Sequence, residues 1–416
     1  MTYIITAPEQ INTSIKLPAS KSISNRALII HAIAKGQIIP QNLSNCDDTE
    51  VIINALKNMP EVIDIKAAGT AMRFTTAYLA TKAGEEHTIT GTERMKHRPI
   101  AVLVDALRYL GAEIEYTGEE GFPPLHIKGK KLEGGHLEVP GNISSQFISA
   151  LLMVGPVLEN GLELKLTGDI ISRPYIDLTL WTMREFGAEA DWTDVDTVTI
   201  KPTQYQDREY LIENDWSAAS YWYEILALSN DTNSCIKLEG LMDGSKQGDS
   251  VLRYIFSLLG IKTTFASKQQ GKPTTVTLKK HKCMLPRLDY DFTGSPDLAQ
   301  TFVVCCCEMG IPFKFTGLVT LKIKETDRIE ALKNELKKLG FVIHDENNNT
   351  LFWDGERCTP TNQPIETYED HRMALAFAPT AFHHQGLKIN HPEVVSKSYP
   401  QYWEDLEKAG FIINKK

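Results

Sequence analysis

A pattern of amphipathic helix, glycine and strand recurs along the chain and constrains its fold more than any other feature. It appears as VDALRYLGAEIEY, LWTMREFGAEADW, RYIFSLLGIKTTF, KNELKKLGFVIHD and EDLEKAGFIIN. The glycines of these segments recur every 70–80 residues or so; they are Gly111, Gly187, Gly260, Gly340 and Gly410. Each suits the left-handed conformation that ends many helices. A fixed period of this length predicts repeated α/β units.

A second pattern alternates with the first. Short strands that end in a polar residue and glycine read TITG, LKLTG, IKLEG and FKFTG, and an apolar helix precedes each of them. The segment TEVIINALKNMPEVIDI supplies a further copy, with Met59 and Pro60 in place of the glycine. Six units in 416 residues divide as three plus three, so we expect an α/β fold of two similar domains. We expect residues 268–273 to form a surface turn between strands.

Composition narrows the class of protein. Hydrophobic residues make up 42% and charged residues 23% of the chain, which is typical of globular domains. The net charge of −9 argues against a general nucleic-acid binder. The sequence has neither a secretory signal nor an apolar run long enough for a membrane span, so a cytoplasmic location is expected. The seven cysteines show no zinc-binding spacing, and the neighbours Cys305, Cys306 and Cys307 suit a buried helix in a reducing compartment.

Polar residues cluster where six apolar helices are expected to begin. These starts read SKSISNRAL, AAGTAMRF, ISSQFISA, NDWSAASYW, SPDLAQTF and EDHRMALAF, and most of them offer a capping residue. For any one of these helix starts, capping alone would explain the polar residues. Arg26, Arg73 and Arg372 follow the caps, although the helix dipole disfavours a cation there. An anion held between each guanidinium and the helix N–H groups would explain them, so these starts predict an electropositive anion site.

Other motifs add charges or exclude functions. RMKHRP, KETDR and SKSYP carry further cations, and Asp327 with Glu330 forms a capping pair that leaves Lys324 and Glu325 on the preceding loop. The chain lacks the glycine-rich loops of P-loop kinases and dinucleotide enzymes and the nucleophile elbow of α/β-hydrolases. His371 has no histidine partner at metal-binding spacing, which disfavours a metal site.

Nine motifs carry a resemblance to a known family. LPASKSISNRAL, AAGTAMR, RMKHRP, GNISSQFISALL, SRPYIDLT, SPDLAQ, IKETDR, EDHRMA and SKSYPQY stand in the order found in 5-enolpyruvylshikimate-3-phosphate (EPSP) synthases. The resemblance runs from about residue 17 to 407. It implies two domains, each of three βαβαββ repeats, in the inside-out α/β barrel of enolpyruvyl transferases. It places residues 20–213 in a domain on the shikimate 3-phosphate side. Residues 1–19 with 214–416 form the domain on the phosphoenolpyruvate side, which carries the acid–base residues.

The resemblance also implies a reaction. The enolpyruvyl group of phosphoenolpyruvate passes to the 5-hydroxyl of shikimate 3-phosphate, with release of phosphate, on the pathway to aromatic amino acids. The methylene carbon must be protonated and the hydroxyl deprotonated, so one acid and one base are needed. By the resemblance Glu325 handles the methylene proton, Asp297 lies near the 5-hydroxyl, and Lys21 touches both substrates. Neither metal nor organic cofactor is implied, and a monomer is expected.

The resemblance assigns two sets of binding residues. Those expected to hold shikimate 3-phosphate are Lys21, Ser22, Arg26, Ser144, Ser145, Gln146, Ser172, Tyr175, Asp297 and Lys324. Those expected to hold phosphoenolpyruvate are Lys21, Gly69, Arg98, Gln146, Arg328, Arg372 and Lys397. The chain departs from the family pattern at Ala67, Phe74 and Thr320, where the family usually has Asn, Pro and Asn. Ala67 and Phe74 adjoin the wall where glyphosate binds in this family, so sensitivity to that inhibitor stays open although Gly69 is retained.

Three alternatives remain. The first is the related transferase that acts on UDP-N-acetylglucosamine, but its reactive loop cysteine is missing near Arg94. The second is a non-catalytic anion-binding module, against which the presence of Lys21, Asp297, Glu325 and Arg372 speaks, because a binding module needs no acid–base set. The third is a domain of a larger multifunctional chain; because the last segment closes a final repeat, we expect a self-contained chain instead.

Overall fold

The chain forms two compact units. The structure, a computed structural model, describes residues 1–267 and 271–416, so part of the turn expected at 268–273 lies outside the described residues. Unit 1 comprises Met1–Pro18 and Glu213–Lys416, and unit 2 comprises Ala19–Ile212. The first two strands of the chain therefore belong to unit 1, and two crossovers join the units.

Unit 2 alternates helices and short strands. Its helices are α1 (Lys21–Ile33), α2 (Asp47–Asn58), α3 (Gly69–Ala80), α4 (Glu93–Lys96), α5 (Ala101–Tyr109), α6 (Ser145–Val154) and α7 (Arg173–Glu185), with a short 3-10 turn η1 (Gly155–Val157). Its strands are β3 (Val62–Asp64), β4 (Glu86–Thr90), β5 (Glu113–Tyr116), β6 (Leu125–Lys128), β7 (Gly135–Pro140), β8 (Leu162–Thr167), β9 (Ala190–Trp192) and β10 (Thr197–Ile200).

Unit 1 has a similar composition. Its helices are α8 (Trp216–Leu228), α9 (Leu252–Leu258), α10 (Ala299–Met309), α11 (Arg328–Lys338), α12 (His371–Phe377) and α13 (Tyr402–Lys408). Its 3-10 turns are η2 (Gly248–Val251), η3 (Pro296–Leu298), η4 (Val319–Ile323), η5 (Ala378–Phe382) and η6 (Pro392–Lys397). Its strands are β1 (Thr2–Thr6), β2 (Asn12–Lys16), β11 (Cys235–Met242), β12 (Ile261–Phe265), β13 (Pro273–Lys280), β14 (Leu288–Asp291), β15 (Phe313–Thr316), β16 (His344–Glu346), β17 (Thr350–Trp353), β18 (Leu387–Asn390) and β19 (Ile412–Lys415).

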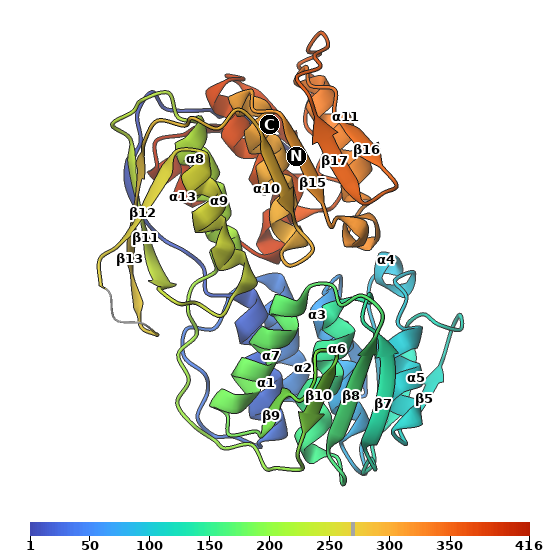
Figure 1. Cartoon of the computed structure of the whole chain (residues 1–416). Coiled ribbons are helices and arrows are strands. Elements are labelled where there is room, and N and C mark those ends of the chain that lie inside the picture. Colours follow the sequence, from blue (N-terminus) through green and yellow to red (C-terminus); the bar gives the residue numbers. More distant parts are fainter. Residues whose placement is uncertain (268–270) are drawn as a thin grey trace. The chain divides into compact units, whose positions relative to one another are not determined.

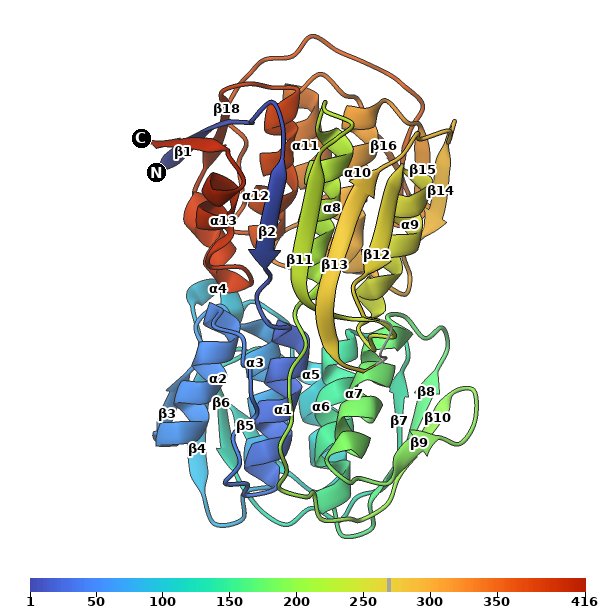
Figure 2. The same ribbon diagram turned by 90° about the vertical axis from the view of Figure 1, so that its left-hand side faces the viewer.

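One sheet pattern repeats through both units. Two sheets of unit 2 run β3-β4-β6-β5 and β7-β8-β10-β9, and the first pair of each is parallel while the rest are antiparallel. The sheets β2-β11-β13-β12 and β14-β15-β17-β16 of unit 1 follow the same rule. Figure 1 shows β7, β8 and β10 side by side in unit 2, and Figure 2 shows β2, β11, β13 and β12 side by side in unit 1. A parallel pair joined through a helix, followed by a helix and a hairpin, is the expected βαβαββ repeat.

Two copies of the repeat are less regular. In the sheet β18-β1-β19, the strand that should pair in parallel with β18 is missing. Only a single parallel bridge, between Ile365 and Ile389, stands in its place. The first copy, at the start of unit 2, keeps only the parallel bridge between Gln41 and Leu211. Pro40 lacks an N–H and Asn42 adopts a left-handed conformation with φ 60°, so a regular ladder cannot extend here. The α/β fold of two similar three-repeat domains is confirmed, with the strands of the first copy largely lost.

Three helices pack together at the centre of each unit. They are α1, α3 and α6 in unit 2, and α8, α10 and α12 in unit 1. The sheets lie outside these helices, so helices such as α3 and α8 are buried nearly all round. This explains why their sequences are apolar on every face, since an amphipathic stripe suits only a helix with one side in water. Cys305, Cys306 and Cys307 lie in this buried region of α10.

The helix-ending glycines behave as the sequence predicts. Gly111 and Gly187 follow α5 and α7 with φ 104° and 86°, and the matching glycines of unit 1 are also left-handed. Gly240 has a second reason to lack a side chain, because a Cβ there would lie 2.1 Å from the Asn214 amide nitrogen. That amide donates to the Glu239 carbonyl at 2.9 Å and fastens the second crossover to β11.

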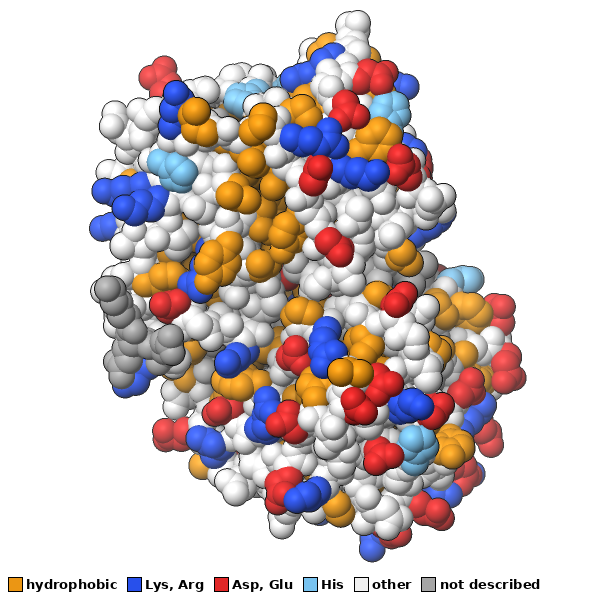
Figure 3. Space-filling model, in the orientation of Figure 1, with side chains coloured by type: hydrophobic (Ala, Val, Ile, Leu, Met, Phe, Trp, Pro, Cys, Tyr) orange, Lys and Arg blue, Asp and Glu red, His pale blue; other side chains and the backbone are white. Residues whose placement is uncertain are grey.

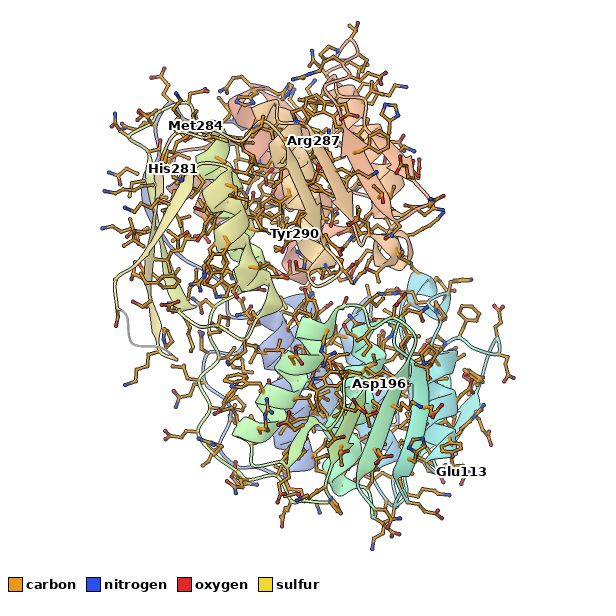
Figure 4. The ribbon with its side chains drawn as sticks, in the orientation of Figure 1. Glu113, Asp196, His281, Met284, Arg287 and Tyr290 are labelled. Carbon is orange, nitrogen blue, oxygen red and sulfur yellow. The ribbon has the colours of Figure 1, made fainter. Side chains whose placement is uncertain are left out.

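The outer face of unit 1 carries an apolar stripe. Tyr254, Leu258 and Met284 are each more than half exposed. Figure 3 shows hydrophobic side chains gathered over α9 and the adjoining strand, and Figure 4 places Met284 and Tyr290 along them. None of the predicted site residues belongs to this stripe. In the described part of the chain, no helix is long and apolar enough to cross a membrane.

Candidate active site

The side chain of Arg328 is the centre of a charged cluster in unit 1. Arg328 is the first residue of α11, and the Asp327 carboxylate caps the helix by accepting from the Glu330 N–H at 3.2 Å. The guanidinium is 2% exposed and donates to three carboxylates. Its distances are 2.6 Å to Asp370, 3.0 Å to Asp297 and 2.9 Å to Glu325. A buried cation with three anionic acceptors is strongly held, and burial alone would lower its pKa while Asp370, Glu325 and Asp297 raise it.

The Asp297 carboxylate is shared by three cations. It sits on η3, and its Oδ1 lies 3.0 Å from Arg328 Nη1 and 3.5 Å from Lys324 Nζ, while Arg372 Nη2 is 3.2 Å from Oδ2. Burial raises the pKa of Asp297, but the charges of Lys324, Arg372 and Arg328 together outweigh it and hold the pKa well below the usual range. The side chain is still 21% exposed, so a ligand can reach it.

Glu325 lies between two cations on the loop before α11. Its Oε2 accepts from Arg328 Nη2 at 2.9 Å, and its Oε1 accepts from Lys397 Nζ at 2.8 Å. The glutamate and the lysine are 15% and 13% exposed. Lys397 is the last residue of η6, so residues 72 positions apart in the sequence meet at this carboxylate.

Arg372 owes its placement to the cap of α12. The Asp370 side chain accepts from the Arg372 N–H at 2.9 Å, which fixes the first turn of the helix. The guanidinium then donates to Asp297 and, through Nη1, to the Tyr221 hydroxyl at 3.1 Å. Asp370 therefore both caps α12 and neutralises Arg328.

The cluster of unit 1 carries more positive than negative charge. Its members are Lys324, Arg328, Arg372 and Lys397 against Asp297, Glu325 and Asp370. Four cations against three carboxylates leave an excess that suits an anionic ligand. Two of the carboxylates remain partly exposed, so the same place can hold charge and move protons.

In unit 2 the start of α3 is crowded by an arginine. A Cβ on Gly69 would lie 2.6 Å from Arg98 Nη1, so only glycine leaves the guanidinium in its place over the helix N-terminus. The Gln146 amide donates to the Thr70 hydroxyl at 3.2 Å, which ties α6 to the same turn. Gly69, Arg98 and Gln146, all assigned to phosphoenolpyruvate, are thus neighbours.

Arg26, assigned to shikimate 3-phosphate, is almost completely buried. Its guanidinium donates to the Thr179 hydroxyl at 2.7 Å, the Ser22 carbonyl at 2.9 Å and the Ser149 hydroxyl at 3.0 Å, and it lies over the Phe74 ring. Burial lowers the pKa of Arg26 to about 10, so it stays charged. In this arrangement Arg26 holds the start of α1 through the Ser22 carbonyl.

Ser144, Ser145, Ser172 and Tyr175, four further residues assigned to shikimate 3-phosphate, lie at two helix starts. Ser144 caps α6, its hydroxyl accepting from the Gln146 N–H at 3.4 Å, and Ser145 is the first residue of that helix. Ser172 precedes α7 in a left-handed conformation with φ 55°, and its carbonyl accepts from the Tyr175 N–H at 3.0 Å. Hydroxyls and N–H groups at helix starts form a phosphate-binding arrangement.

Lys21 begins α1 behind its cap Ser20. Its ammonium lies 3.3 Å from the Asp48 carboxylate, and the lysine and aspartate side chains are 17% and 5% exposed. An ion pair of this kind orients the lysine at the helix start.

Arg73 does not fit the prediction of an anion beside its guanidinium. The side chain is buried and donates to the Gly69 and Pro99 carbonyl oxygens, each at 3.2 Å. It also lies against the Phe147 ring. The guanidinium therefore supports the loop that carries Arg98, because two buried carbonyl oxygens need a donor there.

Sequence reasoning missed several residues that shape these sites. Tyr221 binds Arg372, Asp48 binds Lys21, and Ser149 with Thr179 binds Arg26. All of them are polar side chains inside or beside helices, and nothing in local periodicity separates them from ordinary core or capping residues. Thr320 could be singled out as a departure from the family; its buried hydroxyl has no hydrogen-bond partner among the described residues.

The repeated βαβαββ architecture and the cluster of cations and carboxylates around Arg328 are those expected of one class of protein, the enolpyruvyl transferases. The chain belongs to the EPSP synthase family. The family profile described as EPSP synthase (3-phosphoshikimate 1-carboxyvinyltransferase) matches residues 5–64 and 59–406.

Similar proteins agree with this assignment. A 3-phosphoshikimate 1-carboxyvinyltransferase of Bacteroides fragilis is 58% identical over 414 residues, covering 99% of each chain. One of Haemophilus influenzae is 34% identical over 443 aligned positions, covering 98% of this chain and 99% of the relative. The fold is similar to a solved EPSP synthase of Acinetobacter baumannii, with a TM-score of 0.79, 20% identity and complete coverage of both chains.

Proposed function

We propose that this chain transfers the enolpyruvyl group of phosphoenolpyruvate to the 5-hydroxyl of shikimate 3-phosphate and releases inorganic phosphate. The observation that carries the proposal is the cluster in which Asp297 and Glu325 share Arg328 and are each bound by further cations. Membership of the EPSP synthase family over nearly the whole chain supports the same reaction.

The proposed chemistry is an addition followed by an elimination. A proton adds to the methylene carbon of phosphoenolpyruvate while the 5-hydroxyl oxygen bonds to the neighbouring carbon and loses its proton. The tetrahedral intermediate then expels phosphate as a methyl proton leaves, which restores the double bond. We assign the methylene proton to Glu325 and the hydroxyl proton to Asp297, with Lys21 sharing the proton transfers.

The electrostatics around Asp297 support a substrate-dependent base. Burial raises the pKa of Asp297, but three cations outweigh it and hold the pKa low, and a carboxylate of such low basicity accepts a proton poorly. Substrate anions bound to Arg328, Arg372 and Lys324 would compensate those charges and raise the pKa of Asp297. The base then becomes effective only when the substrates are in place.

The proposed binding roles come from the resemblance to EPSP synthases, and the charges of the cluster support part of them. We assign the phosphate and carboxylate of phosphoenolpyruvate to Lys21, Gly69, Arg98, Gln146, Arg328, Arg372 and Lys397. We assign shikimate 3-phosphate to Lys21, Ser22, Arg26, Ser144, Ser145, Gln146, Ser172, Tyr175, Asp297 and Lys324. The buried position of Arg26 favours an indirect part in which it positions Ser22.

The test is phosphate release from purified protein given both substrates. Release should require both of them, and Glu325→Gln and Asp297→Asn should each lower kcat by about 100- to 10,000-fold. Glu330→Gln is the matched control, since Glu330 lies on α11 and pairs with Lys333 outside the cluster. Turnover of UDP-N-acetylglucosamine in place of shikimate 3-phosphate would replace the proposed acceptor, and ligand binding without turnover would favour a binding module.

We also propose that the enzyme acts as a monomer in the cytoplasm. The supporting observations are a composition typical of globular domains and seven cysteines that are all free thiols, which suits a reducing compartment. Light scattering across a hundredfold range of concentration should give the mass of one chain. A mass of two chains at low concentration would contradict the proposal.

A further inference from the structure

The guanidinium of Arg372 is held by two acceptors of different charge. Its Nη1 donates to the Tyr221 hydroxyl at 3.1 Å, and its Nη2 donates to the Asp297 carboxylate at 3.2 Å. The two acceptors come from α8 and from η3, separate elements of unit 1. Two fixed points set the plane of a guanidinium, whereas one leaves it free to turn.

Tyr221 is itself rigidly placed. Its side chain is buried in α8, and its ring packs edge-on against Tyr402 with centroids 6.1 Å apart and an interplanar angle of 67°. The Tyr402 hydroxyl donates to the Leu375 carbonyl of α12 at 3.0 Å. Since Arg372 is on α12 too, this contact ties the tyrosine pair to the helix that carries the arginine.

The hydroxyl differs from the carboxylate in what it does to the arginine. A guanidinium has only donors, so the phenol oxygen must accept from it. Burial raises the pKa of Tyr221 to about 12 although Arg372 acts against this, so the phenol is neutral at physiological pH. Tyr221 therefore orients the guanidinium without neutralising it, while Asp297 attracts the same charge.

We infer that Tyr221 is a positioning residue that keeps Arg372 from pairing fully with Asp297 and so preserves its charge for the substrate anion. The inference rests on the proposed function, in which Arg372 binds phosphoenolpyruvate. Without the hydroxyl, the guanidinium turns toward Asp297. It then binds phosphoenolpyruvate more weakly and depresses the basicity of Asp297 further.

Tyr221→Phe tests the inference, with Tyr223→Phe as its matched control. Tyr223 lies on the same helix, is equally buried and shares a hydrogen bond with the Thr263 hydroxyl at 2.9 Å, away from Arg372. Loss of a hydrogen bond to a charged group predicts a rise of about 10-fold in the KM for phosphoenolpyruvate in Tyr221→Phe. The KM for shikimate 3-phosphate should stay within about twofold, and Tyr223→Phe should leave both constants at the wild-type value.

Further measurements separate the possible outcomes. The inference would be overturned if Tyr221→Phe and Tyr223→Phe had the same KM for phosphoenolpyruvate. It would also be overturned if Tyr221→Phe changed the KM values of both substrates by the same factor. If Tyr221→Phe folds poorly, 3-fluorotyrosine at position 221 keeps the ring and weakens the oxygen as an acceptor, so the same KM should rise by a smaller factor; an unchanged KM would overturn the inference. If the wild type does not turn over, the proposed function fails. Calorimetric titration with phosphoenolpyruvate then still decides the inference by comparing anion affinity in the wild type and the two variants.

Discussion

Asp370 accepts two hydrogen bonds from one guanidinium: Arg328 Nε lies 2.6 Å from its Oδ2 and Arg328 Nη2 lies 3.3 Å from its Oδ1. The aspartate side chain is fully buried. Removing the Asp370 charge takes away the fully buried partner of Arg328 and leaves its guanidinium only the partly exposed Asp297 and Glu325, which is more costly than losing an exposed ion pair. Asp370→Asn should therefore lower the free energy of unfolding by about 3 kcal/mol, measured by urea denaturation near pH 7.

The control for this prediction is an ion pair on the surface. Asp354 lies 2.5 Å from Arg287 and is 61% exposed. Asp354→Asn should change the free energy of unfolding by less than about 1 kcal/mol, because solvent screens the pair. If Asp370→Asn and Asp354→Asn lowered the free energy of unfolding equally, burial would not make the pair of Asp370 with Arg328 more important for stability.

Glu213 makes stability depend on pH. Burial raises the pKa of this carboxyl group to about 7, although Ser245 and Gln247 donate hydrogen bonds that lower it. An unfolded glutamate has a pKa of about 4.3, so between these values the folded state holds a proton that the unfolded state lacks. The free energy of unfolding contributed by Glu213 therefore falls as pH rises through this window, by roughly 3 kcal/mol in total.

Glu213→Gln removes this dependence. The variant should gain stability relative to the wild type as pH rises from 4 to 8, by roughly 3 kcal/mol over the range, measured by urea denaturation at each pH. The control is Glu239→Gln, since Glu239 is exposed and accepts from the Ser14 hydroxyl at 2.8 Å. A stability difference that does not change with pH for Glu213→Gln would refute the proposed proton uptake.

We expect Ser172 to lower the stability of the fold while it contributes to the binding of shikimate 3-phosphate. Its left-handed φ of 55° costs a side chain about 1–2 kcal/mol, more than the 0.5–1 kcal/mol that glycine loses in entropy. Ser172→Gly should therefore raise the free energy of unfolding by about 1 kcal/mol while raising the KM for shikimate 3-phosphate about 10-fold through loss of the hydroxyl. Thermal unfolding and initial rates measure the two effects.

Lys35 offers the matched control for Ser172. It is exposed and has nearly the same backbone conformation, with φ 52°, but no assigned role. Lys35→Gly should give a similar gain in stability with both KM values unchanged. If Ser172→Gly binds shikimate 3-phosphate as well as the wild type, Ser172 is not part of the phosphate grip.

The repeated fold could be predicted because its signals are local. A glycine after an amphipathic helix, as at Gly111, and a polar cap before an apolar one, as at Ser20, each act within a few residues. Their recurrence gave the number of units. The lost strands of the first copy could not be foreseen, because Gln41 meets its partner Leu211 across 170 positions and the effect of Asn42 depends on that distant pairing.

The charged residues of the candidate site could be predicted from the sequence, but the contacts between residues far apart in the sequence could not. Lys324, Glu325 and Arg328 adjoin in the sequence, so a capped helix start brings them together. Tyr221, by contrast, reaches Arg372 from 151 positions away, and its sequence context is that of an ordinary buried helix. For Arg73 the sequence predicted a contact that differs from the observed one. A cation at a helix start suggested a bound anion, but the Arg73 guanidinium donates to two carbonyl oxygens.

Gly69 and Arg98 yield the last prediction. A Cβ at position 69 would lie 2.6 Å from Arg98 Nη1 and 3.1 Å from its Cζ. Because these atoms are the end of a flexible side chain, Gly69→Ala should displace the guanidinium and leave α3 intact. The KM for phosphoenolpyruvate should rise about 10-fold, with stability within about 0.5 kcal/mol of the wild type.

A double-mutant cycle shows whether the change at Gly69 acts through Arg98. Arg98→Ala alone should raise the KM for phosphoenolpyruvate, since a charge-assisted contact is lost. If Gly69→Ala works by displacing that arginine, it should add little in the Arg98→Ala background, because residues in contact are not additive. Equal factors in both backgrounds would show that the new methyl group obstructs the ligand directly, and that Arg98 does not transmit the effect.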